Sequence, residues 1–529
     1  MDSSCTHLSY KETGYFSRIV CDYLDNHTAL HPFIEHEVSL EGLRASIAQR
    51  KKFPTNRNVL TTYLEKQYKE TDYPIVQNNI TLLSEENTFT ITTAHQPAIF
   101  TGTLYFIYKI LHAIRLAKHL AEKMPGYNFV PVFYMGCEDA DLEELGKIYL
   151  NGEKITWDTK QTGAVGRMKT AGLEKIVHRI EGELNVKPYG QELSILIRQH
   201  YLNAPNLQTG TFHLLNELFS AYGLIVLVPD DADLKRLMIP VFEDDLFKQT
   251  AATIVEDTVE KLHEYKVQAN PREINLFYLA DGIRARIVQQ QDKWIVVGTS
   301  LSFTSSELKN ELNEHPEHFS PNVILRGLFQ ETILPNIAFI GGGGELAYWL
   351  ELKNLFRHFG VPYPVLVLRN SFLILEKKWK EKMQQLGLTE KMMFLSEKDL
   401  MDIIVKRASS HQLSLEEEIL TAGKYYDHLK KVATTVDRTL EQHVSALHAK
   451  AVKPLQVLEK KLLRAEKRKY EAQERSIEAL RQNLFPHDSL QERIENFMPF
   501  YAKYGREFIE TIEKNSLALE QQFTVLTLE

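Results

Sequence analysis

The chain contains few cysteines and no long apolar run. Its 529 residues include three cysteines, Cys5, Cys21 and Cys137, too few and too scattered for a disulfide scaffold. No CxxC or Cys-His ligand spacing occurs among them, so no structural zinc site is expected. No window reaches 18 apolar residues, and the N-terminal stretch lacks the basic and apolar regions of a signal peptide. These absences predict a cytoplasmic protein that does not span a membrane.

Neither sign of charge is in large excess. The 62 basic and 70 acidic residues give a net charge of −8, which argues against nucleic acid or an anionic membrane as the main partner. Hydrophobic residues make up 43% and charged residues 25%, the mixture of an ordinary globular protein. The length predicts two to four domains with enough material for a large core.

A run of four glycines, Gly341 to Gly344, follows the apolar residues 337–340, yet the two familiar phosphate-binding glycine motifs are absent. The dinucleotide fingerprint needs a glycine where Leu346 stands and an acidic residue about 20 positions on, near Pro364. The P-loop needs lysine where Glu345 stands. Glycines between a strand and a helix predict a turn at which a ligand approaches the backbone, and free helix-terminal amides favour an anion. A flexible turn without a ligand is the alternative.

Short, continuous apolar segments alternate with helical patterns over the first part of the chain. We expect strands near 89–93, 129–135, 224–229 and 364–368, and a long helix over 104–124. Strands that are apolar throughout are typical of a parallel sheet covered on both faces. The fold class predicted is therefore α/β, with a Rossmann-like parallel-sheet core.

Three further regions complete the predicted domain organisation. The core spans 1–375, with inserted subdomains near 150–210 and 260–320; Asp-Gly and Gln-Asp turns in the second predict an antiparallel meander. Residues 376–488 are rich in lysine and glutamate and predict a C-terminal α-helical coiled-coil domain. Residues 489–529 are expected to return to the core.

The coiled-coil region carries one apolar seam. From Val436 to Ala465, apolar residues recur at a spacing of three to four. A single seam predicts a homodimer, and a hairpin within one chain is the alternative. Pro454 should kink or split the helix, which we expect to end at Pro486. The basic run 459–475 is typical of a solvated face; a nucleic-acid stripe is the other interpretation.

Polar residues follow the ends of the predicted strands, where open α/β sheets bind ligands. We expect them to form one anion-binding pocket, with a salt-bridged rim as the alternative. Tyr348 and Trp349 are expected in the core. The candidates are Gln96, Glu138, Arg326, Gln330, Glu331, Gly341, Gly342, Gly343, Gly344, Glu345, Arg369 and Asn370 for binding, and His95, Asp139 and Asp141 for catalysis.

Each chemical type suggests a role. His95 can act as a general base or donate to a phosphate, or simply cap a helix. Asp139 and Asp141 can hold an ammonium group or hydrated Mg²⁺, or only add charge to a helix N-terminus. Arg326 and Arg369 have the fork geometry that binds carboxylates, with an internal ion pair as the alternative. No metal ligands are assigned among these residues.

Four blocks of sequence resemble one known family. They are Gln330 to Lys353 (QETILPNIAFIGGGGELAYWLELK), Thr93 to Ile110 (TAHQPAIFTGTLYFIYKI), Val130 to Leu145 (VPVFYMGCEDADLEEL) and Leu484 to Phe497 (LFPHDSLQERIENF). In their order along the chain and in the length of the chain, these blocks resemble the BshC family, the cysteine ligases of bacillithiol biosynthesis. The resemblance covers nearly the whole chain and is more specific than the glycine run alone.

The resemblance implies a carbon–nitrogen ligase that adds cysteine to the amine of glucosaminyl-malate. Joining a free carboxylate to an amine needs activation, which ATP with Mg²⁺ would supply as an adenylate or acyl-phosphate. Arginines would then bind malate, and carboxylates would bind an ammonium group. The amides of the glycine turn would bind a phosphate. Many family members carry Gln-Gln in place of His95-Gln96, which makes His95 a weaker candidate for an essential base.

Two other classes of function remain open. One is a coiled-coil assembly or binding protein with a nucleotide-fold scaffold, and the other is a nucleotidyl-transferring enzyme acting on a different substrate. The HIGH and KMSKS motifs of aminoacyl-tRNA synthetases are absent, so activation by their route is not supported. The general base, the mode of cysteine selection and any metal requirement stay open.

Overall fold

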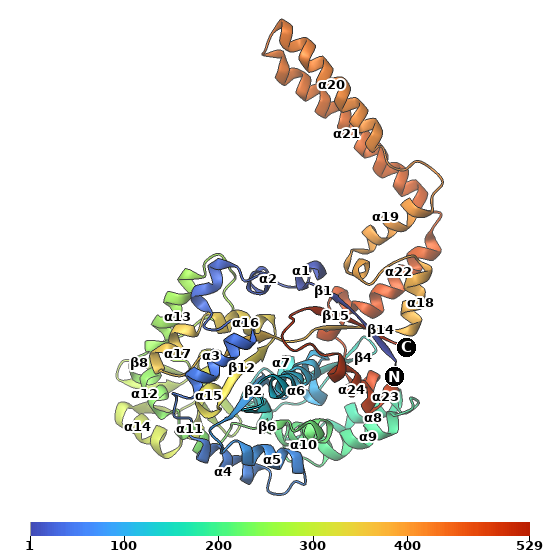
Figure 1. Ribbon diagram of the computed structural model, residues 1–529. Coiled ribbons are helices and arrows are strands. Elements are labelled where there is room, and N and C mark those ends of the chain that lie inside the picture. Colours follow the sequence, from blue (N-terminus) through green and yellow to red (C-terminus); the bar gives the residue numbers. More distant parts are fainter. Residues whose placement is uncertain (1) are drawn as a thin grey trace. The chain divides into compact units, whose positions relative to one another are not determined.

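The computed structural model describes residues 2–529, and a five-stranded parallel sheet lies within its larger compact unit (Figure 1). Its strands are β2 (Thr88–His95), β3 (Asn128–Met135), β6 (Ile225–Leu227), β12 (Asn336–Gly341) and β13 (Val365–Leu368). They lie in the order β13-β12-β2-β3-β6, and all pair in parallel. The four predicted strands are confirmed. The fifth, β12, is the apolar run before the four glycines.

The sheet is buried on both faces, which explains why β13 is apolar throughout and why β2 combines apolar residues with buried threonines. On one face, side chains of α3 (Leu40–Arg50) and α6 (Tyr105–Lys123) form one apolar cluster with β2, β12 and β13. On the other, Trp349 stacks on Phe339 of β12 at a centroid distance of 4.4 Å. The long helix predicted over 104–124 and the core position of Trp349 are confirmed.

Buried threonines in β2 satisfy their hydroxyl groups within the sheet. Thr90 and Thr92 donate to Asn336 Oδ1 at 3.1 and 2.8 Å, and Thr93 donates to the Ile340 carbonyl at 2.8 Å. A buried hydroxyl without such a partner would destabilise the sheet. These bonds fix β2 beside β12, the two strands on which the pocket is built.

The remaining elements of the core surround this sheet. The N-terminal region contains β1 (Ser3–Leu8), α1 (Tyr10–Thr13), α2 (Arg18–Leu24), α4 (Arg57–Gln67) and α5 (Pro74–Leu82). The first inserted region contains α7 (Leu142–Leu145), β4 (Lys147–Leu150), β5 (Glu153–Thr156), α8 (Glu174–Leu184), α9 (Gly190–Ile197) and α10 (Leu207–Phe219). After β6 come α11 (Ala232–Arg236), α12 (Ile239–Phe247) and α13 (Thr250–Lys261).

The second inserted region is an antiparallel sheet, as the turn residues predicted. Its strands lie in the order β10-β9-β8-β7-β11. They are β7 (Leu276–Ala280), β8 (Ile283–Gln290), β9 (Lys293–Val296), β10 (Ser302–Thr304) and β11 (Phe319–Pro321), with α14 (Ser305–Glu314) between the last two. Three helices complete the core: α15 (Val323–Ile333), α16 (Gly343–Leu350) and α17 (Lys353–Phe359).

The chain divides into two compact units. One comprises 1–373 with 489–526, and the other 374–488 with 527–529. The chain passes between them within β14 (Phe372–Glu376) and β15 (Phe523–Leu528), which pair with β1 in a small sheet of order β1-β15-β14. The C-terminal part of the first unit adds α23 (Met498–Tyr504) and α24 (Arg506–Asn515).

The returning segment holds a strained loop of the core in place. Phe100 and Thr101, in the loop before α6, have positive φ angles of 48° and 66°. Such angles are costly for residues other than glycine and persist only where neighbours impose them. Asn496 donates from Nδ2 to the Phe100 carbonyl at 3.0 Å and also to the Gly102 carbonyl. Two blocks of the family resemblance thus meet at this loop.

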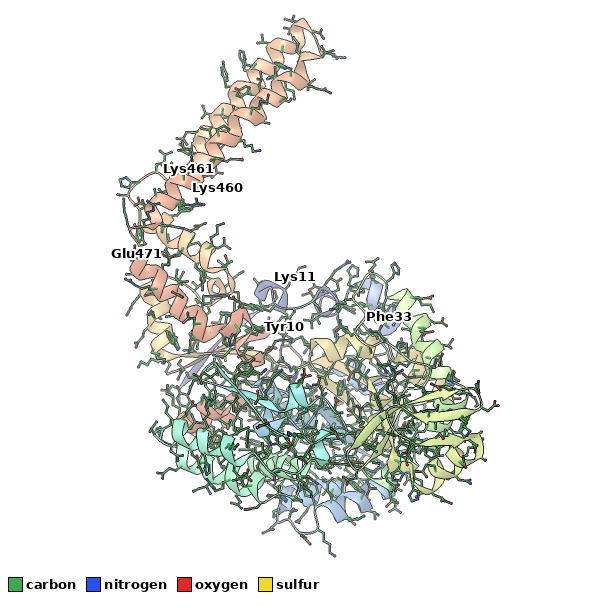
Figure 2. All side chains as sticks on the ribbon, turned by 180° about the vertical axis from the view of Figure 1, so that it is seen from behind. Tyr10, Lys11, Phe33, Lys460, Lys461 and Glu471 are labelled. Carbon is green, nitrogen blue, oxygen red and sulfur yellow. The ribbon has the colours of Figure 1, made fainter. Side chains whose placement is uncertain are left out.

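The second unit is helical. Its helices are α18 (Lys377–Gln385), α19 (Glu397–Ala408), α20 (Glu416–Val436), α21 (Leu440–Lys467) and α22 (Glu471–Leu484), and α20 and α21 pack as a hairpin. Of the kink or split expected at Pro454, the split is wrong, because α21 runs through this proline. The expected end at Pro486 is confirmed, since α22 ends at Leu484. The exposed side chains of Lys460 and Lys461 lie on α21 and fit a solvated face (Figure 2).

The hairpin leaves apolar side chains exposed. Leu420, Tyr425 and Val436 are 58%, 60% and 79% exposed. Among residues 2–529, no helix is both long and apolar enough to cross a membrane. The three cysteines are free thiols.

His112 of α6 predicts acid sensitivity of the first unit. It is fully buried, accepts from the Asn370 amide at 3.1 Å and donates to the Ala518 carbonyl at 2.9 Å. Burial lowers its pKa to about 4, although the Ala518 carbonyl opposes the shift. The unfolded chain takes up this proton below pH 6.5 and the folded chain only near pH 4, so stability falls as pH falls through that window. We expect a loss of about 3 kcal/mol.

The variant His112→Gln tests this expectation, because its amide can still donate to Ala518 but does not titrate. Urea unfolding between pH 4.5 and 7.5 should show a shallower loss of stability in the variant than in the wild type. Equal slopes would show that His112 carries none of the pH dependence. His95 has a similarly lowered pKa and retains its own share in both proteins.

Candidate active site

The strand order creates a crevice between β2 and β12. From β2 the chain proceeds to β3 and β6 on one side of the sheet, whereas β12 and β13 lie on the other. Such a switch point is where open α/β sheets bind ligands, beyond the carboxyl ends of the strands. A pocket of about 320 Å³ lies there, with His95 and Gln96 from the end of β2 and Gly342 to Gly344 after β12.

Most of the candidate residues line this one pocket. Those that do are His95, Gln96, Glu138, Asp139, Arg326, Gly342, Gly343, Gly344, Glu345 and Arg369. The expectation that all candidates share the cavity is wrong for Asp141, Gln330, Glu331, Gly341 and Asn370. Each of these five has another position in the fold.

Glu331 and Gln330 lie in the core. Both are fully buried near the end of α15. They lie about one helical turn after Arg326, which corresponds to about 6 Å along the helix axis. Glu331 forms a salt bridge with Arg50 at 2.7 Å, and Gln330 donates to Glu331 at 2.9 Å. The internal ion pair, one of the alternatives above, is the arrangement that Glu331 adopts, although its partner is Arg50.

Asp141, Asn370 and Gly341 serve the backbone. Asp141 is the N-cap of α7, where its carboxylate accepts from the Glu144 amide at 3.0 Å, and it faces a neighbouring hollow. Asn370 donates to the Leu517 carbonyl at 2.9 Å. Gly341 is the last residue of β12, and its carbonyl accepts from the Arg369 amide at 2.8 Å. Local hydrogen bonds thus take up the groups that the sequence suggested for a ligand.

The glycine turn presents open amides to the pocket. Gly342 is the N-cap of α16, and its amide donates to Glu345 Oε2 at 2.8 Å. The same carboxylate binds Lys109 Nζ at 2.5 Å. The amides of Gly343 and Gly344 belong to the first helical turn, whose N–H groups have no acceptor within a helix. They are therefore placed to donate to an anion in the pocket.

The position of Gly344 tests this role. None of the four glycines has a positive φ, and a Cβ at Gly344 would have no heavy atom within 4 Å. Gly344→Ala should therefore keep the fold, with a gain of up to about 1 kcal/mol from helix propensity. It should weaken the binding of a dicarboxylate such as malate about tenfold, since a methyl group would stand beside the donating amides.

Gly126→Ala is the matched control, because a Cβ there also meets no neighbour and the residue is exposed outside the pocket. Thermal melting and calorimetric titration with malate measure the two effects separately. If Gly344→Ala binds malate as tightly as the control does, the ligand does not approach the backbone at this turn.

Arg326 is a cation available to a ligand. Its guanidinium donates to the Tyr348 hydroxyl and lies 5.9 Å from the ring centroid of Tyr134, and in the described chain it forms no salt bridge. Arg369 differs, because it binds Glu492 at 2.7 Å and donates to Ser371 Oγ at 3.0 Å. Arg369 therefore adopts the internal ion pair that was the alternative to a ligand-binding role, with Glu492 as its partner, although the side chain still lines the pocket.

His95 is a neutral imidazole at the pocket wall. Its Nδ1 lies 2.9 Å from the Gln96 carbonyl, which can only accept, so Nε2 accepts from the Tyr105 hydroxyl at 3.1 Å. Burial and the nearby charge of Lys109 lower its pKa to about 4. A group with this pKa is a weak base at neutral pH. The geometry favours a role in orienting Tyr105.

Glu138 and Asp139, two of the carboxylates that line the pocket, differ in how firmly other side chains hold them. Glu138 accepts from Ser320 Oγ at 2.9 Å and forms a salt bridge with the buried Lys235. Asp139 accepts from Gln96 Nε2 at 3.0 Å and lies 3.9 Å from Arg284, with 36% of its side chain exposed. Asp139 is therefore the better placed of the two for an ammonium group or a hydrated cation.

Sequence reasoning missed several pocket residues. Lys109 does not line the pocket but lies behind it, 1% exposed, where it joins the lining residue Glu345 to the Ala94 carbonyl, both at 2.5 Å. Its signal was available, since a lysine within an apolar helical segment needs a buried partner. Tyr348, expected in the core, contributes its hydroxyl to the pocket wall. Arg284 comes from the second inserted region, and nothing local in the sequence indicates that it reaches the pocket.

Fold and site together define a class: a Rossmann-like α/β protein with a polar pocket at its switch point and a helical coiled-coil unit. Two family models match the chain. The N-terminal Rossmann-like domain of bacillithiol biosynthesis BshC matches residues 1–370, and the C-terminal coiled-coil domain matches 372–528. The chain belongs to the BshC family.

Full-length relatives agree with this assignment, and each bears the name "Putative cysteine ligase BshC". The protein from Flavobacterium johnsoniae is 41% identical over 100% of both chains. The protein from Christiangramia forsetii is 38% identical over 100% of this chain and 99% of its own. The more distant protein from Salinibacter ruber is 28% identical over 94% of each. The resemblance found in the four sequence blocks is thereby confirmed, and the chain is a ligase of this family.

Proposed function

We propose that the chain joins the carboxyl group of cysteine to the glucosamine amine of glucosaminyl-malate, forming bacillithiol. The observation that carries the proposal is that the guanidinium of Arg326, which has no salt bridge among residues 2–529, lines the same pocket as the open amides of Gly343 and Gly344. These groups suit the carboxylates of malate. Asp139, across the same pocket, suits an ammonium group.

ATP, with Mg²⁺, is the activator that we propose. The cysteine carboxylate would attack a phosphorus atom of ATP, and pyrophosphate or ADP would leave. The amine would then attack the activated carbonyl and lose a proton, and AMP or phosphate would leave. During activation, Gly343 and Gly344 could hold a phosphate and Asp139 the hydrated metal, which leaves Arg326 for a malate carboxylate. The cytoplasm, which supplies ATP and reduced cysteine, suits this reaction.

The test is the reaction itself. Purified protein is incubated with cysteine, glucosaminyl-malate, ATP and Mg²⁺, and mass spectrometry follows both the thiol product and the nucleotide released. The proposal expects product only when all components are present, with one AMP or ADP for each amide bond formed. Nucleotide turnover without the amide product would favour a nucleotidyl-transferring enzyme with another substrate. Absence of both would favour a binding protein.

We also propose that the chain forms a homodimer through the hairpin of α20 and α21. Intramolecular pairing leaves apolar residues of the hairpin exposed, among them Leu447, Val457 and Leu458 at 40–46%. A second copy would cover them, and self-pairing is the commonest closed arrangement. Light scattering at micromolar concentration should give twice the chain mass of 61.1 kDa. A monomer would contradict this proposal and leave the ligase proposal intact.

A further inference from the structure

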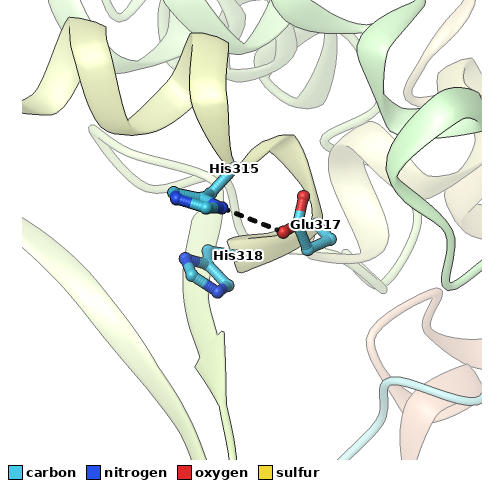
Figure 3. A group of neighbouring side chains, drawn as sticks. All are labelled: His315, Glu317 and His318. Carbon is cyan, nitrogen blue, oxygen red and sulfur yellow. Dashed lines mark hydrogen bonds and ion pairs between the residues drawn. The ribbon is translucent and has the colours of Figure 1, made fainter.

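A second cluster of potential ligands lies outside the pocket, on the turn between α14 and β11. His315, Glu317 and His318 stand within four residues, and each can present one ligand atom within 4.8 Å of the others. Their side chains lie close together at the turn in Figure 3. The ligase proposal uses none of the three.

The spacing of these atoms fits one metal ion. His315 Nδ1 lies 3.2 Å from Glu317 Oε1. Two atoms that bind one tetrahedral zinc ion at its usual bond lengths are about 3.3 Å apart. The rings of His315 and His318 stack at 5.0 Å with an angle of 23° between them. The other carboxylate oxygen of Glu317, Oε2, is shielded from solvent and has no hydrogen-bond partner within residues 2–529.

A neighbouring carboxylate orients one of the ligands. Glu311 Oε1 lies 2.6 Å from His318 Nδ1 and accepts from the Tyr278 hydroxyl at 2.7 Å. An ionised carboxylate only accepts, so Nδ1 carries the proton and the lone pair of Nε2 is free. Histidines that bind metals usually donate their other ring N–H to a carboxylate in this way. Glu311 therefore prepares His318 for an ion.

We propose that His315, Glu317 and His318 bind a divalent first-row transition ion such as Zn²⁺. Two imidazoles and one carboxylate form a donor set that binds zinc and leaves a position for water. The side chains are 48%, 31% and 30% exposed, so an ion can enter from solvent. Sequence reasoning missed the site because it examined only spacings that involve cysteine.

The site lies on a segment that forms one wall of the pocket. The Glu317 carbonyl accepts from Lys235 Nζ at 3.0 Å, and Lys235 also pairs with Glu138 and Asp230. Three residues after Glu317, Ser320 donates to Glu138. An ion bound at the turn therefore stiffens the segment that holds Glu138, and it can do so whether or not the chain is a ligase.

The first test is a calorimetric titration of the chelator-treated, full-length protein with Zn²⁺. The wild type and the control His358→Gln, which removes an exposed histidine elsewhere, should bind one ion per chain. His315→Gln and His318→Gln should weaken binding by more than about 100-fold, and Glu311→Gln by about 10- to 100-fold. Thermal melting of each apo protein confirms folding. Equal affinity in all five proteins, or no Zn²⁺ binding by the wild type, would overturn the proposal.

The second test is hydrogen exchange with and without Zn²⁺. The amides of 315–322 should exchange more slowly with Zn²⁺ in the wild type and at the same rate in His318→Gln. Unchanged exchange in the wild type would contradict the effect on the pocket wall. Neither test measures ligation, so both distinguish a failure of the metal site from a failure of the proposed function.

Discussion

Replacing Arg326 by alanine should weaken the binding of malate or glucosaminyl-malate about 10- to 150-fold. A charge-assisted contact of a guanidinium with a carboxylate contributes about 1.5–3 kcal/mol. Arg326 has no salt-bridge partner among the described residues, so its charge is available to the ligand. Arg326→Lys keeps the charge but loses the planar fork, so its affinity for the ligand should lie between those of the wild type and of Arg326→Ala.

Calorimetric titration of folded proteins gives the dissociation constants for this comparison. The control is Arg357→Ala, whose side chain is 70% exposed, lies 3.8 Å from Glu35 and does not line the pocket. It should bind like the wild type. If Arg326→Ala also binds like the wild type, the anion lies elsewhere and the assignment of the pocket fails.

Replacing Glu331 by glutamine should destabilise the fold by about 3–5 kcal/mol and leave the ligand affinity of the folded protein unchanged. The change leaves Arg50 buried without a counterion, and breaking one half of a buried pair costs this much. Arg50 also donates to the Asn336 and Pro362 carbonyls at 2.8 and 3.2 Å, so it joins α3 to β12 and to the segment before β13. Burial lowers its pKa to about 10, against the attraction of Glu331, and it stays charged at neutral pH.

Glu264→Gln provides the comparison on the surface. Glu264 pairs with Arg18 at 3.2 Å, and these side chains are 55% and 62% exposed. Exposed pairs of this kind contribute no more than about 1 kcal/mol. Urea unfolding at pH 7 compares the variants. If Glu331→Gln is as stable as the wild type but binds the ligand more weakly, Glu331 belongs to the binding site, as the sequence predicted.

The sheet could be predicted because its strands are buried on both faces and are therefore rich in apolar residues. The sequence predicted β13 from residues 364–368, and β12 is the apolar run that precedes the glycines. Of the kink or split predicted at Pro454, the split does not occur, since α21 continues through the proline. Helix propensity is a local quantity, and the packing of α20 on α21 can outweigh it.

The site was predicted only in part, because the sequence shows which strand a residue follows but not which way its side chain points. Arg326 and Glu331 lie on one helix five positions apart, yet one faces the pocket and the other faces Arg50, 281 positions away. Arg369 follows a strand end, as predicted, but Glu492 from the returning segment occupies its fork. Partners so distant in sequence leave no local pattern.

A crystal of the full chain soaked with malate tests the central claim most directly. The account predicts density for one malate carboxylate on the Arg326 guanidinium, with the amides of Gly343 and Gly344 donating to the same ligand. Density at another place, with Arg326 still bound only to Tyr348, would contradict the claim that this pocket is where the ligase holds its substrate.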